Sequence, residues 1–225
     1  MKIAPSILAA DQSDLKTEVR RVEEAGADMI HIDIADGHFA PNITLGPDTV
    51  KALRRVTNLP LDVHLMIDEP GKFIGPFLEA GSDMITVHAE VVNEKSLATL
   101  SRDVHERGKK IGLAMKPATP LPHWLKNQTE NVDLVLILSV NPGFAGQQFI
   151  PTVLPKVEVA IQTFGGRSLE VEVDGGVDTK NAAQIVKAGA TVLVAGASIF
   201  RRGDAKLALK EMRAVAEGKV REVSA

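Results

Sequence analysis

Four side chains in this sequence have the types and the spacing of a metal or acid–base site. His31 and Asp33 lie two residues apart in the apolar run MIHIDIA, so on a strand their side chains share one face. His64 lies in LDVHLMI with Met66 on its face, and Asp174 ends LEVEVD. Imidazole and carboxylate groups together suit a borderline divalent metal such as Zn²⁺, Fe²⁺, Mn²⁺ or Co²⁺. The chain has no cysteine, so any metal must be bound by His, Asp or Glu.

Each of these residues also has a purely structural interpretation. A single histidine on a strand is more often a hydrogen-bonded core residue than a metal ligand. For the set together the metal interpretation is favoured, because burying two unpaired carboxylates is costly and a cation removes that cost. For His88 and Glu90, in MITVHAE, the two interpretations are equally supported. We expect His105 and His123 on a surface helix or loop.

The chain alternates between two kinds of segment that could position these residues. Short apolar runs predict eight strands, over residues 2–8, 29–35, 61–67, 84–90, 110–115, 134–140, 169–174 and 191–196. Amphipathic stretches predict a helix after each strand, over residues 14–26, 48–56, 71–81, 96–108, 122–128, 152–165, 179–189 and 205–218. Three of the helices end in Ala-Gly and lead directly into a strand, which indicates a repeated unit.

Eight such units in 225 residues, without a linker, predict an α/β fold of the (β/α)8 TIM-barrel type, as one domain over residues 1–225. An open doubly wound sheet is the alternative, but it would be expected to have a Gly-rich loop after the first strand, where this chain has LAADQSD. In a barrel, functional residues lie at the C-terminal ends of the strands. The histidines and carboxylates described above lie at or near such ends.

The composition excludes several classes of protein. A hydrophobic content of 44% and a charged content of 24% are typical of a globular chain. The net charge is −3 and the sequence has no run of basic residues, so it does not predict a positively charged surface that would bind nucleic acid. No segment approaches about 18 unbroken apolar residues, so no membrane span is predicted. The first residues include no long apolar signal region, and we expect a cytoplasmic protein.

Glycine-rich turns predict a phosphate-binding region. VNPGFAGQ (140–147), VDGGV (173–177) and VAGAS (194–198) follow the sixth, seventh and eighth predicted strands. Glycines let the backbone approach a ligand closely, and free N–H groups at a helix start attract phosphate. The loops after strands 7 and 8 bind phosphate in many barrels.

With these motifs in view, the chain resembles the ribulose-phosphate 3-epimerase family over essentially its whole length. The stretches that carry the resemblance are APSILAAD, HIDIADGHFAPNITLGP, LDVHLMI, TVHAE, NPGFAGQQFIP, VDGG and VAGASIF. The resemblance implies a TIM barrel of the ribulose-phosphate-binding type. It also implies an isomerase that interconverts D-ribulose 5-phosphate and D-xylulose 5-phosphate at C3 by two-base proton transfer through a metal-stabilised enediolate.

The resemblance further implies roles for individual residues. Asp33 and Asp174 would be the catalytic acid–base pair. One divalent metal ion per chain would be bound by His31, Asp33, His64 and Asp174. The phosphorylated ketose would be bound by Ser6, His64, Met66 and Asp174, by a closing loop of Gly143, Phe144, Ala145 and Gly146, and at its phosphate by Gly175, Gly176, Gly196 and Ala197. We also expect a homo-oligomer, since barrels of this kind commonly assemble through their outer helices.

Three alternatives remain open at the level of sequence. The family usually has Met at the positions of Ala35 and Leu138, Gly at Ala145 and Ser at Ala197, so a ketohexose 6-phosphate such as D-allulose 6-phosphate is a second candidate substrate. A decarboxylase or aldol-type synthase on a similar barrel would be expected to have Asp-x-Lys-x-x-Asp, whereas HIDIAD has no lysine. A non-catalytic sugar-phosphate sensor would need none of the metal-site residues.

Overall fold

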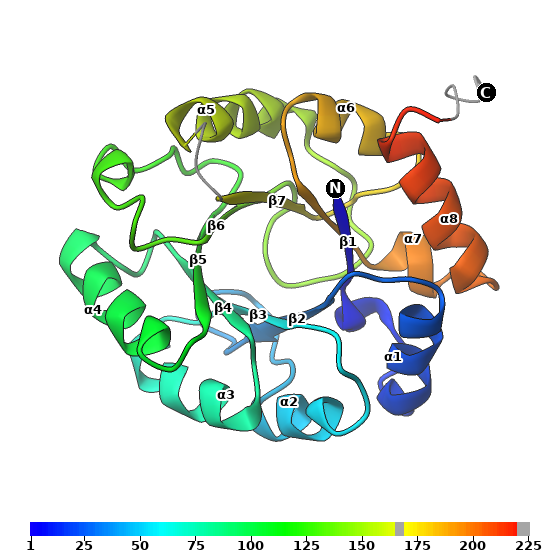
Figure 1. Cartoon of the computed structure of the whole chain (residues 1–225), viewed down its shortest axis with the longest axis horizontal. Helices are drawn as coiled ribbons and strands as arrows, with labels where there is room; N and C mark the ends of the chain where they lie inside the picture. The colour runs from blue at the N-terminus through cyan, green and yellow to red at the C-terminus, as the bar shows by residue number, and fades with distance from the viewer. Residues whose placement is uncertain (165–168, 220–225) are drawn as a thin grey trace.

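Parallel strands form the centre of this protein, and the computed structural model describes residues 1–164 and 169–219. The strands are β1 (Lys2–Pro5), β2 (Ile30–Ala35), β3 (Leu61–Met66), β4 (Met84–His88), β5 (Lys110–Met115), β6 (Leu134–Leu138), β7 (Glu170–Asp174) and β8 (Val192–Ala195). They form one 8-stranded sheet in the order β1-β8-β7-β6-β5-β4-β3-β2. Figure 1 shows this sheet curved into a nearly closed barrel inside a ring of helices. The predicted TIM-barrel fold is confirmed.

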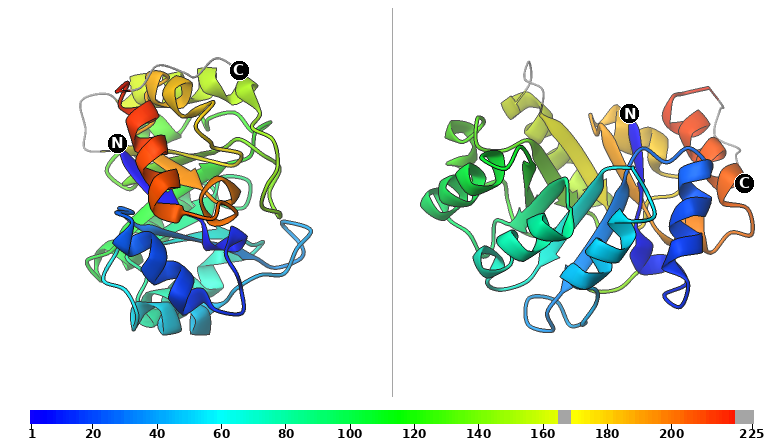
Figure 2. Two further views of the ribbon diagram at one scale, coloured as in Figure 1. Left: turned by 90° about the vertical axis from the view of Figure 1, so that its right-hand side faces the viewer. Right: turned by 60° about the horizontal axis from the view of Figure 1, so that its bottom comes forward.

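Helices follow the strands and cover the outside of the barrel (Figure 2). They are α1 (Leu15–Glu24), α2 (Pro47–Arg54), α3 (Ile74–Ala80), α4 (Glu94–His105), α5 (Leu154–Phe164), α6 (Ala182–Lys187), α7 (Ala197–Phe200) and α8 (Ala205–Ala216). Short 3-10 turns are η1 (Ile7–Ala9), η2 (Pro70–Lys72), η3 (Leu125–Asn127) and η4 (Pro151–Val153). No helix of the described residues is long and apolar enough to cross a membrane.

Two helix predictions need correction or completion. The α-helix predicted over residues 122–128 is wrong, because only the 3-10 turn η3 forms there. Asn127 N–H donates to Trp124 O and Gln128 N–H to Leu125 O, the i→i+3 pattern of a 3-10 turn, and Leu125 is the only fully buried side chain in η3. Such a short segment buries too little apolar surface to sustain an α-helix. The helix predicted over 152–165 is present as η4 and α5, and its last residue lies outside the described residues.

The two faces of the strands bury different kinds of side chain. On β2 the side chains of Ile30, Ile32 and Ile34 belong to the large apolar core shared with the helices. The alternate residues His31 and Asp33 point the other way, because successive side chains on a strand point to opposite faces. The same alternation on other strands brings further buried polar residues to the barrel interior, namely Asp62, His64, Thr86, His88 and Glu172.

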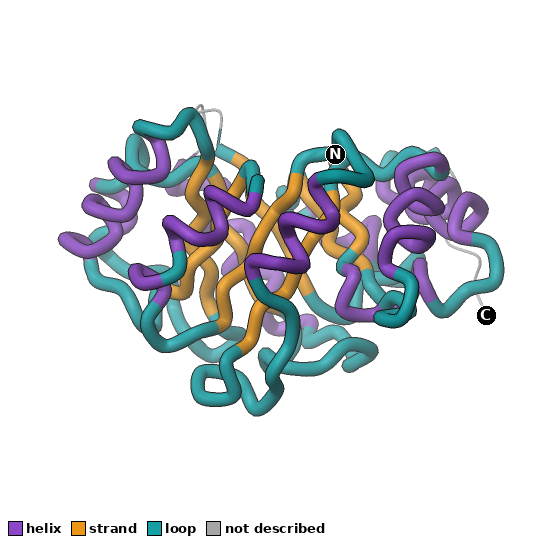
Figure 3. The backbone as a smooth tube through the Cα atoms, turned by 90° about the horizontal axis from the view of Figure 1, so that it is seen from below, coloured by secondary structure: helices purple, strands orange, loops and turns teal. Residues whose placement is uncertain are grey.

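The barrel closes where β1 meets β2. A parallel bridge joins Ser6 to His31, the Asp28 N–H donates to Ile3 O at 3.0 Å, and Ile3 N–H donates to Asp28 Oδ2 at 2.7 Å. Since every strand pair is parallel, all C-terminal strand ends lie at one end of the barrel, where long loops gather (Figure 3). This closure brings residues from β2, β3 and β7 within reach of each other.

Gly112 on β5 provides a test of packing inside the barrel. A Cβ added there would lie 2.3 Å from Thr86 Oγ1 and 3.0 Å from Leu134 Cδ2. We expect Gly112→Ala to lower the free energy of unfolding by about 1–3 kcal/mol, measured by urea denaturation, because overpacking forces neighbours to move. The control is Gly75→Ala on α3, where the added Cβ would have no neighbour closer than 3.9 Å. That variant should be as stable as the parent or up to about 0.5 kcal/mol more stable; equal stability of both variants would contradict the packing.

Candidate active site

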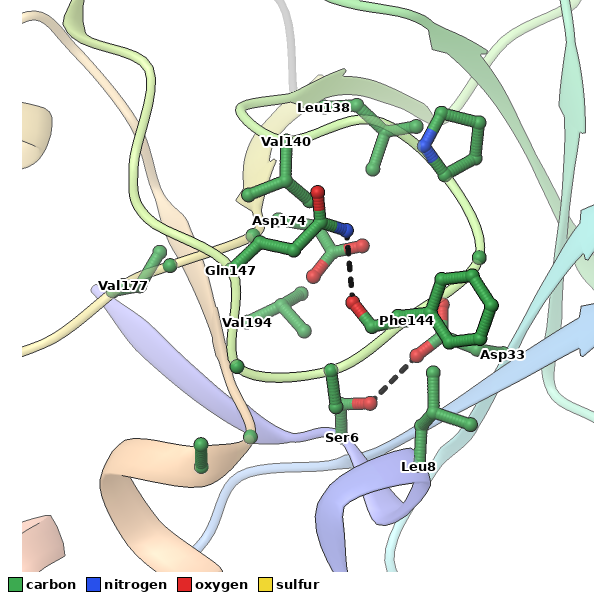
Figure 4. A pocket seen from close by; sticks show the side chains of 18 of the residues that line it. Ser6, Leu8, Asp33, Leu138, Val140, Phe144, Gln147, Asp174, Val177 and Val194 are labelled. Carbon is green, nitrogen blue, oxygen red and sulfur yellow. Dashed lines mark hydrogen bonds between the residues drawn. The ribbon is translucent and has the colours of Figure 1, made fainter. Parts of the chain in front are cut away.

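A cavity of about 340 Å³ opens at the C-terminal ends of the strands. Asp33 from β2 and Asp174 from β7 point into it, and Phe144 lies across its mouth (Figure 4). Loops after β6, β7 and β8 form most of the remaining wall. The predicted site residues that line the cavity are Ser6, Asp33, Met66, Gly143, Phe144, Ala145, Gly146, Asp174, Gly175, Gly176, Gly196 and Ala197.

His31, Asp33, His64 and Asp174 converge on one point beneath this cavity. One nitrogen or carboxylate oxygen from each residue lies within 4.8 Å of those of the other three. Asp33 Oδ1 lies 3.3 Å from His31 Nε2 and 3.1 Å from His64 Nδ1. Asp174 Oδ2 lies 3.9 Å from His31 Nε2 and 3.8 Å from His64 Nδ1. The β2–β3 register, which pairs Asp33 with His64, explains how two strands contribute to one cluster.

This cluster could hold a divalent metal ion. His31 Nε2 is fully buried and has no hydrogen-bond partner among the described residues, although it faces two carboxylates. Two imidazole nitrogens and two carboxylate oxygens form a donor set that borderline divalent metals accept. The geometry and chemistry of the four residues therefore fit the metal that the sequence predicts.

A second buried cluster lies on the other side of the His31 ring. His31 Nδ1 lies 2.7 Å from Asp62 Oδ2 and 3.1 Å from Glu172 Oε1, and none of the three residues has solvent exposure. Burial opposes a charge on His31, but Asp33 and Asp62 raise its pKa well above the ordinary value. Burial and the nearby Asp62 charge raise the pKa of Glu172 to about 8. Glu172 is therefore protonated at neutral pH, and His31 Nδ1–H donates to Asp62.

His64 is supported by a different chain of contacts. His64 Nε2 lies 2.8 Å from His88 Nε2, and His88 Nδ1 lies 3.0 Å from Glu90 Oε2. Glu90 Oε1 in turn accepts the Lys116 backbone N–H at 2.8 Å. Burial lowers the pKa of His88 to about 4, so this imidazole is neutral at physiological pH. His88 and Glu90 are thus not members of the four-residue cluster and instead fix the ring orientation of His64.

Asp33 and Asp174 have opposite electrostatic environments. Burial would raise the pKa of Asp33, but His31 and His64 lower it far below its usual range, and Ser6 Oγ donates to Asp33 Oδ2 at 2.6 Å. Burial and the charge of Asp33 raise the pKa of Asp174 to about 6. In the absence of a metal, Asp33 is therefore ionised over a pH range in which Asp174 retains its proton.

Glycines in the loops allow close backbone packing at the other end of the cavity. Gly175 and Gly176 have φ of +115° and +66°, and a Cβ on Gly176 would lie 2.4 Å from Phe149 N. No side chain could replace hydrogen at Gly176 without moving this backbone. The β6–α5 loop is held by Asn42 Nδ2, which donates to Gly143 O at 2.7 Å, and by Gln147 Nε2, which donates to Phe144 O at 2.9 Å (Figure 4).

Some candidate residues lie elsewhere. Ala35 is buried in an apolar cluster with Phe39, Ala40 and Met66 and does not line the cavity, whereas Leu138 does. His105 lies on α4 with its side chain partly exposed and bound to Asp133 Oδ2 at 2.8 Å, and His123 lies in an exposed turn, as expected.

Sequence reasoning did not identify Asp62 and Glu172 as part of the site. A signal for both was present, because each lies two residues before a candidate ligand, Asp62 before His64 and Glu172 before Asp174. The two-residue spacing puts each pair on one strand face. Their contact with His31, however, depends on how the strands are arranged around the barrel.

Active sites of (β/α)8-barrel enzymes lie at the C-terminal strand ends, where this chain has a buried cluster of histidines and carboxylates. The Ribulose-phosphate 3 epimerase family profile matches residues 2–200. Ribulose-phosphate 3-epimerase of Bacillus subtilis (strain 168) is 46% identical over 216 residues, which cover 95% of this chain and 98% of that one. The chloroplastic ribulose-5-phosphate-3-epimerase of Arabidopsis thaliana is 44% identical over 214 residues, which cover 94% and 76%. The chain belongs to the ribulose-phosphate 3-epimerase family and is an isomerase.

Solved structures share the same barrel at low sequence identity. A 3-hexulose-6-phosphate synthase from Salmonella typhimurium has a TM-score of 0.72 at 18% identity, covering 98% of this chain and 100% of that one. KGPDC from Streptococcus mutans in complex with D-R5P has a TM-score of 0.76 at 11% identity, covering 96% and 97%. These likenesses support the fold alone, whereas the family match favours an epimerase over the alternative enzyme classes.

The raised pKa of Glu172 predicts a pH dependence of stability. The folded protein keeps a proton on Glu172 up to about pH 8, whereas the unfolded chain loses it near the ordinary value of 4.5. The folded state therefore binds more protons between these values, and this residue's contribution to the free energy of unfolding falls as the pH rises through that window. We expect Glu172→Gln, which cannot titrate, to gain roughly 1 kcal/mol or more relative to the parent between pH 5 and pH 8.

Urea denaturation in the presence of a chelator measures this difference at both pH values. Glu170→Gln on the same strand is the matched control, because Glu170 is partly exposed and paired with Lys2. If the free energy of unfolding changed with pH in the same way for the parent and for Glu172→Gln, the assignment of a protonated Glu172 would be contradicted.

Proposed function

We propose that this chain interconverts D-ribulose 5-phosphate and D-xylulose 5-phosphate by two-base proton transfer at C3, with one divalent metal ion per chain. The proposal is carried by the meeting of two carboxylates and two imidazoles beside one cavity, in a chain that belongs to the ribulose-phosphate 3-epimerase family. Cytoplasmic location and assembly into a homo-oligomer remain predictions from the sequence.

Inversion at C3 needs two acid–base groups. A single base would return the proton to the face from which it was removed. Asp33 and Asp174 come from β2 and β7, which are separated by β1 and β8 around the closed barrel, so they reach the substrate from different sides. The ionised Asp33 carboxylate is suited to remove the C3 proton, and the carboxylic acid of Asp174 is suited to donate a proton to the opposite face. In the reverse direction the two residues exchange roles.

Metal binding falls to His31, Asp33, His64 and Asp174 in this proposal. A bound divalent cation supplies positive charge that stabilises negative charge developing on the substrate oxygens next to C3. Asp62 accepts from His31 Nδ1–H and so leaves His31 Nε2 free to face the metal position. His88 has the corresponding role for His64, since it occupies the nitrogen that faces away from the cluster.

Substrate recognition falls to the loops. Backbone N–H groups of Gly175, Gly176 and the Gly196–Ala197 turn would bind the phosphate, Ser6 and Met66 would contact the sugar, and residues 143–146 would close over it. Closure would exclude water from the reacting carbon and limit loss of the intermediate. The exposed Phe144 ring, 56% accessible at the cavity mouth, provides the apolar surface for such a cover.

Removing either carboxylate tests the two-base assignment. We expect Asp33→Asn and Asp174→Asn each to reduce turnover of D-ribulose 5-phosphate by about 10²-fold or more, because each removes an acid–base group. NMR in D₂O, with metal added, measures deuterium incorporation at C3 and formation of xylulose 5-phosphate. Asp48→Asn, an exposed carboxylate on α2, is the control and should keep full activity.

Full activity of either site variant would reassign the acid–base pair. Absence of C3 exchange by the metal-loaded parent would refute the proposed function. Faster turnover of D-allulose 6-phosphate than of D-ribulose 5-phosphate would change the substrate assignment to the hexose.

Metal binding should release protons. His31, with a pKa raised well above its ordinary value, must lose its Nε2 proton to act as a ligand. We therefore expect the apparent affinity for Zn²⁺ or Mn²⁺ to rise with pH from 5.5 to 7.5. Calorimetry in buffers of different ionisation enthalpy should detect release of about one proton per metal at neutral pH. A pH-independent affinity would contradict this protonation state.

A further inference from the structure

The phosphate end of the cavity lacks a cationic side chain in its wall. Of the described residues that line the cavity, none is lysine or arginine, whereas Asp33, Asp174 and Asp178 are acidic. A phosphate dianion entering this space would meet backbone N–H groups and the acidic Asp178, with no cationic side chain in the wall itself. A positive charge just outside the wall would therefore strongly affect binding.

Arg201 lies directly behind this part of the wall. A Cβ added to Gly146, which lines the cavity, would lie 2.9 Å from Arg201 Nη1 and 3.5 Å from Arg201 Cζ. Arg201 follows α7, the helix that begins after the Gly196 turn. The guanidinium thus lies against the β6–α5 loop at Gly146, the neighbour of Gln147, whose carbonyl oxygen lies 2.9 Å from a Cβ added at Gly176.

The Arg201 guanidinium also has N–H donors that are available to bind a ligand. Its side chain is exposed, and no hydrogen bond or ion pair engages it within residues 1–164 and 169–219. Its neighbour Arg202 donates to Glu211 at 2.6 Å. Lys156 Nζ, another cation near the strand ends, donates to Lys116 O at 2.9 Å and to Pro117 O at 2.8 Å. Arg201 therefore has free donors beside the cavity that these other cations do not have.

Glycine at position 146 allows the guanidinium to lie this close to the loop backbone. Gly146 has φ of +86°, and any side chain there would meet the guanidinium. A planar guanidinium presents several N–H donors in a geometry that matches phosphate oxygens. We propose that Arg201 is a specificity-determining residue that attracts and holds the phosphate group of the substrate across the Gly146 segment of the loop; this inference rests on the proposed function.

The test compares three variants of Arg201 with a matched control. Arg201→Gln removes the charge, and Arg201→Met keeps the aliphatic packing without the charge. Arg201→Lys keeps a positive charge but lacks the planar guanidinium. Arg202→Gln, the adjacent arginine paired with Glu211, is the control. KM and kcat for D-ribulose 5-phosphate and the competitive inhibition constant of inorganic phosphate are measured at about 20 mM and about 500 mM salt.

We expect Arg201→Gln and Arg201→Met to raise KM and the phosphate inhibition constant about tenfold at low salt, with kcat changed less than twofold. This pattern means that the lost interaction stabilised the bound ground state and the transition state equally. The effect should shrink at high salt because exposed charges are screened, Arg201→Lys should recover part of the affinity, and Arg202→Gln should match the parent.

Three results would overturn the proposal. Unchanged KM and inhibition constant in Arg201→Gln would show that the charge does not reach the phosphate. Normal behaviour of Arg201→Met beside an impaired Arg201→Gln would assign a packing role instead. A loss confined to kcat would assign Arg201 to loop positioning. Titration of the parent and Arg201→Gln with inorganic phosphate by calorimetry gives a result even if the parent fails to turn over D-ribulose 5-phosphate, so failure of the proposed function is distinguishable.

Discussion

The burial of ionisable side chains inside the barrel is the constraint on which the rest of the site depends. His31 is fully buried and lies between two pairs of carboxylates, with Asp62 and Glu172 at one nitrogen and Asp33 and Asp174 at the other. An unpaired charge in such a place would be strongly destabilising, whereas a paired and hydrogen-bonded one is tolerated. The His31 imidazole therefore connects the structural interior of the barrel to the chemistry at its open end.

The same burial separates the protonation states of the carboxylates. Asp33 contacts both histidines and Ser6, so it remains ionised, while Asp174 and Glu172 have fewer compensating partners and retain protons to higher pH. An acid and a base on one substrate position are what inversion of a carbon centre requires. In the proposed reaction this difference follows from where each carboxylate lies in the barrel, since all are the same functional group.

Chemistry and recognition are carried by different parts of the fold. The proposed acid–base and metal residues lie on strands β2, β3 and β7; β3 and β7 pair with a strand on each side, and β2 pairs with β3 and is joined to Ser6 by one bridge. The proposed phosphate contacts lie on loops, where glycines permit close approach and where Phe144 and Gly146 form part of the proposed cover. Rigid strands keep the reacting groups aligned, while loops can adapt to a charged ligand and to an arginine behind them.

The strands, most of the helices and the main candidate residues could be predicted from the sequence alone. Alternation in MIHIDIA placed His31 and Asp33 on one strand face, because side chains of a strand alternate strictly, and glycine pairs marked turns that other residues cannot adopt. The residues that meet across the barrel could be known only from the folded structure: Asp62 and Glu172 at His31, His88 at His64, and Arg201 at Gly146. Those contacts join distant segments through strand register and barrel closure, and local periodicity contains no information about them. The 3-10 turn at residues 125–127 likewise depended on how little apolar surface that segment buries in the folded protein.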